Sequence, residues 1–189
     1  MIEFLLLVVR VAAFEPKSDI HFRLNLTYEL ASCSRGLNSR MVPTNISAAQ
    51  RFVDLVTVGP VPSVDALARS LDELALSYHD TPVGEPSDCE DEPKHKSDVT
   101  DGEIAARFPD FGYYGTVFGI DVPGEAVVGD AIDDILDITN DLKEVLWRFD
   151  RFGADDAHWY FRMLYQIHWG EHLRGLAGYL YWRLRNDGE

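Results

Sequence analysis

Residues 127–149 read VVGDAIDDILDITNDLKEVLWRF, and this stretch decides the fold. Its apolar side chains recur three and four residues apart, which is the spacing of one face of an α-helix. They are Ile132, Ile135, Ile138, Leu142, Val145 and Leu146. We therefore expect a long helix from about Ala126 to Phe149 that buries this stripe.

A second long helix is expected from about Asp155 to Arg185, with aspartates at its start and arginines at its end, as the helix dipole favours. The short connection around Gly153 favours antiparallel packing of the two. Upstream, periodicity predicts a helix over residues 46–58 and another after Ser63. A short third helix, capped by Asp98 or Thr100, is expected to run through Ile104 to Phe108.

Residues 108–118 read FPDFGYYGTVF and are too rich in glycine and aromatic residues for a regular helix. We expect a loop whose rings pack over the bundle, or alternatively a groove that faces a ligand. The candidate ligand contacts are Tyr113, Tyr114 and Phe118, together with Trp169 from the second long helix. No strand alternation opposes an all-α fold: a helical bundle with two long antiparallel C-terminal helices and an aromatic, glycine-rich loop.

Charge divides the chain near Met41. Four acidic and five basic residues precede it, whereas 28 acidic and 12 basic residues follow. We interpret residues 1–40 as an upstream extension, with Met41 as the natural start, or as a poorly ordered arm. Residues 41–189 are expected to form a single helical domain. The acidic segment 81–97 is interpreted as a mobile loop.

The formal net charge of −15 argues against binding to nucleic acid or to an anionic membrane surface. The apolar stretch at residues 2–14 is too short to span a bilayer. The two cysteines, Cys33 and Cys89, form no metal-binding pair and no disulfide framework, which favours a reducing, cytoplasmic location.

Carboxylates follow one side of the first long helix, where residues three, four and seven positions apart share a face. Asp133, Asp134, Asp137 and Asp141 have such spacings. Side chains of this kind hold hard cations such as Mg²⁺ or Mn²⁺. The alternative is a solvated acidic face near the positive end of the helix dipole.

The second long helix carries HWGEH at residues 168–172. His168 and His172 are four residues apart, so their rings project from one face toward the protein interior, as in helical zinc sites. With the four aspartates they are the candidate ligands of a divalent metal (Mg, Mn or Zn). Without a metal, an aspartate of one helix would accept a hydrogen bond from a histidine of the other.

The runs VVGDAIDDILDITNDLK at 127–143 and HWGEH at 168–172 resemble the bacterial family called domain of unknown function 5063. That family has D-D-L-x-D-I-Y-x-D-L-K and H-W-G-x-H stretches; here Ile135 replaces the leucine and Thr139 the tyrosine. The resemblance implies an all-helical cytosolic protein and draws attention to the same aspartates and histidines. It implies no reaction.

The leading functional hypothesis is a non-enzymatic helical module that binds a protein or a small ligand. One alternative is a metal-dependent hydrolase of phosphate esters or nucleotides, in which a metal-bound water is the nucleophile. Few basic residues are available there to hold a phosphate: Lys143, Arg148, Arg162 and Arg174. A structural subunit of a larger assembly is the third hypothesis, and the oligomeric state stays open.

Overall fold

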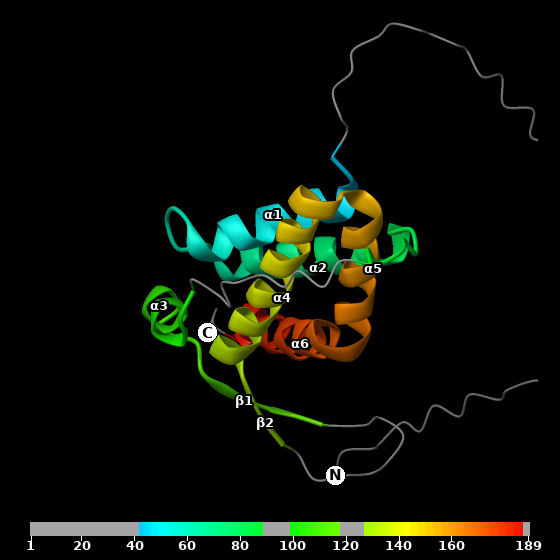
Figure 1. Cartoon of the computed structure of the whole chain (residues 1–189). Helices are drawn as coiled ribbons and strands as arrows, with labels where there is room; N and C mark the ends of the chain where they lie inside the picture. The colour runs from blue at the N-terminus through cyan, green and yellow to red at the C-terminus, as the bar shows by residue number, and fades with distance from the viewer. Residues whose placement is uncertain (1–41, 89–98, 118–126, 187–189) are drawn as a thin grey trace, which may run out of the picture. The chain divides into compact units, whose positions relative to one another are not determined.

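The computed structural model describes residues 42–88, 99–117 and 127–186. The elements in chain order are α1 (Thr44–Thr57), α2 (Val64–Asp80), α3 (Asp101–Arg107), β1 (Tyr113–Thr116), β2 (Val127–Asp130), α4 (Ala131–Phe152), α5 (Ala154–Leu164), a π-helical turn (Tyr165–Trp169) and α6 (Gly170–Asn186), as Figure 1 shows. The expected helical fold is confirmed. Residues 1–40, Met41, both cysteines and Phe118 lie outside the described residues.

Local capping explains where two of the helices begin. The Ser63 hydroxyl accepts a hydrogen bond from the Ala66 amide at 3.2 Å, as predicted for the start of α2. At α3 the capping residue is Thr100: its hydroxyl accepts from the Glu103 amide, and the Glu103 carboxylate accepts from the Thr100 amide. This reciprocal pair fixes the entry into α3.

The all-α expectation misses a β-hairpin. β1 and β2 pair antiparallel, with Tyr113 opposite Asp130 and Thr116 opposite Val127. Each strand is only four residues long, too short for an alternating pattern to stand out. Because the hairpin takes up residues 127–130, α4 begins at Ala131 rather than Ala126, and the Asp130 carboxylate caps it by accepting from the Ile132 amide at 3.0 Å.

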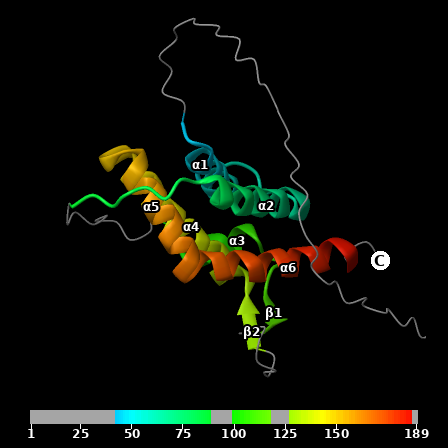
Figure 2. The ribbon, with the colours of Figure 1, turned by 90° about the vertical axis from the view of Figure 1, so that its right-hand side faces the viewer.

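The second long helix is not continuous. The chain changes direction between α5 and α6 (Figures 1 and 2), at the π-helical turn. Gly170 permits this turn: its amide bonds to the Tyr165 carbonyl, and a Cβ on Gly170 would collide with that same oxygen. Consequently α5 runs antiparallel to α4, whereas α6 passes the first half of α4, where Asp134 and Asp141 lie.

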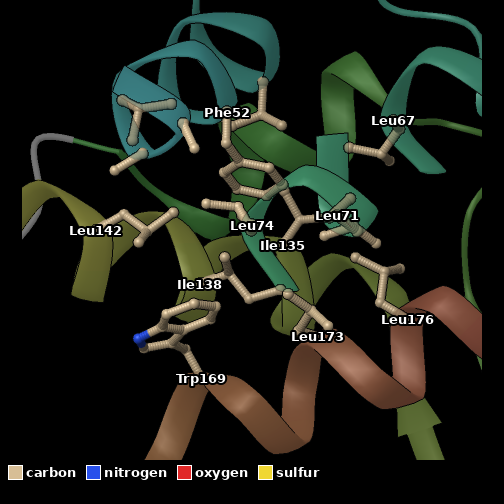
Figure 3. Packing of buried hydrophobic residues seen from close by; sticks show 14 of the residues in the cluster. Phe52, Leu67, Leu71, Leu74, Ile135, Ile138, Leu142, Trp169, Leu173 and Leu176 are labelled. Atoms are coloured by element: carbon tan, nitrogen blue, oxygen red, sulfur yellow. The ribbon is translucent and has the colours of Figure 1, made fainter. Parts of the chain in front are cut away.

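The core lies where α1, α2, α4 and α6 meet (Figure 3). Phe52, Leu71, Ile138 and Leu173 are fully or almost fully buried there, and burial of each such side chain contributes roughly 1.5–3 kcal/mol. Trp169 is also fully buried and packs against Phe161, so its interpretation as a ligand contact is wrong. Its place is in the core.

The first half of the acidic segment is not a mobile loop, because it packs against α5. The Ser87 amide donates a hydrogen bond to the Asp156 carboxylate at 2.7 Å. Gly84 has a positive φ of 67° and lies so close to α5 that a Cβ would collide with the Asp155 carbonyl oxygen. Residues 89–98 lie outside the described part of the chain.

Within the residues described, none of the helices is both long and apolar enough to cross a membrane.

Candidate functional site

Histidines and aspartates meet where α6 passes the first half of α4. His168 belongs to the π-helical turn and His172 to the first turn of α6. On α4, Asp134, Asp137 and Asp141 face them, because positions three and seven residues apart lie on one side of a helix. We call these five residues the His–Asp cluster.

His172 is held between two carboxylates. Its Nδ1 lies 2.8 Å from Oδ1 of Asp134, and its Nε2 lies 3.3 Å from Oδ2 of Asp137. Asp134 is buried, so the ring of His172 is fixed from the protein side. The other ring nitrogen is left facing Asp137.

His168 repeats this arrangement one helical turn earlier. Its Nδ1 lies 2.7 Å from Oδ2 of Asp141, and its Nε2 lies 3.9 Å from the same Asp137 oxygen that His172 approaches. The two imidazole rings lie edge to face with their centroids 4.9 Å apart. The pairing of aspartates with histidines expected from the sequence is therefore present.

Both Nε2 atoms thus converge on one oxygen of Asp137, while both Nδ1 atoms are held by other carboxylates. Ligand atoms of Asp137, His168 and His172 all lie within 4.8 Å of one another. The side chain of His168 is 43% exposed, so the convergence point is open to solvent. His168 does not point into the interior as expected, because the turn at Tyr165–Trp169 places Trp169 there instead, whereas His172 is partly buried against Asp134.

The pKa values of His172, of Asp141 and of the neighbouring Asp133 are shifted. The hydrogen bond to Asp134 raises the pKa of His172, with burial acting in the opposite direction. Burial raises the pKa of Asp141, although its hydrogen bond with His168 opposes this. The pKa of Asp133 is also raised, by partial desolvation and then by the charge of Asp137.

Tyr114 joins the cluster from the hairpin. Its hydroxyl donates a hydrogen bond of 2.5 Å to Oδ2 of Asp134, the carboxylate that holds His172. Burial and this bond raise the pKa of Tyr114, so the hydroxyl remains a donor at neutral pH. The ring stacks on Tyr179 with centroids 5.1 Å apart. The sequence singled out Tyr114 only as a ligand contact, since nothing local predicted its partner on α4.

On the other side of Tyr114, β1 and α6 enclose a groove of about 440 Å³, which we call the hairpin groove. Tyr113 lines it, as the groove interpretation expected. Arg174 and Trp182 line it as well, and sequence reasoning did not place either there. Phe118 lies outside the described residues.

The remaining candidates stand apart from the cluster. Asp133 is exposed and is not among the grouped ligand atoms. Arg148 is buried, paired with Glu144 at 2.9 Å and with Asp156 at 3.5 Å. Arg162 donates to two carbonyl oxygens at the end of α2, those of Tyr78 and Thr81.

No protein-family model and no curated protein matches the chain. Among solved structures, the chain is similar to the crystal structure of protein BF1032 from Bacteroides fragilis, a structural-genomics target. The TM-score is 0.56 at 17% sequence identity, over 76% of this chain and 91% of that one. At this identity the likeness shows a shared fold. The resemblance to the domain of unknown function 5063 family stays a prediction.

Proposed function

We propose that this protein is a metal-binding module that holds a divalent transition-metal ion between His168 Nε2, His172 Nε2 and the Asp137 carboxylate. The observation that carries the proposal is the convergence of both Nε2 atoms on one Asp137 oxygen. Asp134 and Asp141 hold the two Nδ1 atoms. This is the arrangement by which carboxylates orient metal-binding histidines and raise their basicity.

The donor set favours some metals over others. Two imidazole nitrogens with one carboxylate oxygen suit Zn²⁺ best, and the carboxylate also suits Mn²⁺, whereas Mg²⁺ prefers oxygen ligands alone. Three protein ligands leave at least one coordination position for water or for a bound molecule. The solvent-facing side of His168 is where that position would lie.

The alternative is a set of Asp–His hydrogen bonds that only joins α4 to α6. Such bonds account for the two Nδ1 contacts. Because a neutral imidazole has a single N–H donor, they account for the Nε2 contacts with Asp137 only if the rings are protonated. A metal accounts for both sets of contacts with one arrangement.

The test is calorimetric titration of the full chain, without a His tag and after treatment with EDTA, with Zn²⁺, Mn²⁺ and Mg²⁺. We expect one transition-metal ion per chain and weaker Mg²⁺ binding. His168→Ala and Asp137→Ala should abolish binding with unchanged helicity, whereas Asp133→Ala, on an exposed position of the same helix, should retain it. If the first two variants bind like the wild type, or only lose stability, the proposal is wrong.

A hydrolase is the second candidate, because an open position beside three protein ligands is the arrangement of catalytic metal sites. A phosphate-ester substrate has limited support, since Arg148 and Arg162 make contacts elsewhere. The check is release of nitrophenol from p-nitrophenyl phosphate by the metal-loaded protein. Activity that His168→Ala abolishes would support this candidate, and metal binding without turnover would leave the module as proposed.

A further inference from the structure

We propose that the hairpin groove is a second binding site, which takes a small planar aromatic molecule carrying an anionic group. None of the residues of the His–Asp cluster lines this groove. Tyr114 forms the wall between the two, since its ring lines the groove and its hydroxyl bonds to Asp134. The inference does not depend on whether a metal binds.

Aromatic rings give the groove its shape. Tyr113 and Trp182 are 77% and 60% exposed, although both are large apolar side chains. They lie on β1 and α6, and Tyr114 also lines the groove. A flat ring that stacks among them would remove these surfaces from water, which is the main source of affinity in aromatic sites.

Glycines keep the groove open. A Cβ added at Gly115 or at Gly178 would meet no atom within 4 Å, so the backbone there borders empty space. The enclosed volume of about 440 Å³ falls within the range of small-molecule sites. It is too small for a folded partner and large enough for one or two fused rings.

The positive charge in the hairpin groove favours an anionic ligand. Among the described residues, Arg174 is the one charged side chain that lines the groove, and no carboxylate is part of that lining. Its Nη2 donates to the Tyr165 hydroxyl at 2.9 Å, which positions the guanidinium. A guanidinium has five N–H donors, so others are available to a ligand. The net charge of −15 acts at longer range and is screened beyond about 8 Å at physiological salt.

Three probes of one shape and different charge test this: 2-naphthoate, 2-naphthylmethanol and 2-naphthylmethylamine. Each is titrated by calorimetry and by amide NMR into the full chain in EDTA, which keeps the metal proposal out of the result. We expect 2-naphthoate to bind most tightly and the amine most weakly. Amide signals of Gly115 and Gly178 should shift on binding. Equal or tighter binding of the amine, or shifts confined to other regions, would overturn the proposal.

Matched variants locate the site. Gly178→Leu should fill the groove and abolish binding of naphthoate and naphthylmethanol alike, whereas Gly102→Leu, at a similarly open glycine of α3, should change neither. Arg174→Gln should weaken naphthoate by about tenfold or more, as loss of a charge-assisted hydrogen bond does, and leave naphthylmethanol unchanged. Undiminished binding to Gly178→Leu would refute the site.

Discussion

Gly175 lies directly against the hydroxyl group of Tyr114, so that a Cβ at position 175 would collide with that oxygen. The same hydroxyl donates to Asp134. We therefore expect Gly175→Ala to push Tyr114 out of place, break the hydrogen bond and lower the free energy of unfolding by about 1–3 kcal/mol. Urea denaturation measures this loss.

Gly178 provides the control for that variant. It lies one turn further along α6, where a Cβ meets nothing within 4 Å. Because alanine favours a helix more than glycine does, Gly178→Ala should leave stability unchanged or raise it by up to ~1 kcal/mol. Equal losses from both alanine variants would show that the contact with Tyr114 is not the cause.

His172 makes the stability of the metal-free protein depend on pH. Its pKa is raised in the folded state by the hydrogen bond to Asp134. A group that binds its proton more tightly when folded stabilises the fold below its unfolded pKa, about 6.5 for histidine, and this contribution is lost as pH rises through the folded pKa. In EDTA, the stability difference between wild type and His172→Gln should therefore be larger at about pH 6 than at about pH 9.

Denaturation curves for both proteins across that range give the difference directly. Taking the difference removes the titration of histidines outside the cluster, such as His79 and His158, which is common to both proteins. A difference that stays constant or grows with pH would contradict a raised pKa at His172.

Substitutions at Asp141 and Asp133 distinguish a carboxylate that orients a metal ligand from one that only adds negative charge. Asp141 holds Nδ1 of His168 at 2.7 Å, whereas Asp133 on the same helix is exposed and outside the grouped ligand atoms. Under the metal proposal, Asp141→Ala should weaken Zn²⁺ affinity about 10- to 100-fold, the usual effect of losing a carboxylate that orients a histidine ligand. Asp133→Ala removes the same charge and should have little effect. Similar losses in competition titrations would mean that only the local negative charge matters.

Local signals in the sequence predicted the helices and missed what interrupts them. Ser63 is a strong cap followed by leucines at helical spacing, so the start of α2 was predictable. The hairpin was not, since its strands are four residues each and their pairing depends on residues on both sides of an intervening segment. The π-helical turn at Tyr165–Trp169 was hidden because the sequence continues with helix-compatible residues, and Gly170 alone marks it.

The candidate site was also predictable only in part: the sequence indicated which residues share a helix face, but not which contacts form between elements. Spacing placed Asp134, Asp137 and Asp141 on one face of α4, and the structure places His168 and His172 opposite them. Spacing gave no means to assign a partner to Tyr114, because its contact with Asp134 arises from how the hairpin folds back onto α6. Trp169 lies between the two histidines in the sequence. It was misassigned because the π-helical turn directs its side chain into the core.

His158 is buried on α5, and within the described residues neither of its ring nitrogens has a hydrogen-bond partner. Burial lowers its pKa, with the charge of Asp155 acting in the opposite direction. Since an unpaired buried polar group costs about 1–3 kcal/mol, replacing it with an apolar side chain should remove that cost. We expect His158→Leu to raise the free energy of unfolding by roughly 1 kcal/mol at neutral pH.

The gain from His158→Leu should increase in acid. A histidine whose pKa is lowered by folding binds its proton more tightly in the unfolded chain, so it weakens the fold as pH falls through about 6.5. Urea denaturation at about pH 7.5 and pH 5.5 should therefore show a larger advantage of His158→Leu at the lower pH. His79→Leu, at an exposed position near the end of α2, should change stability little at either pH. A variant at position 158 that is less stable than wild type at both values would mean that the imidazole makes a favourable contact in the folded protein.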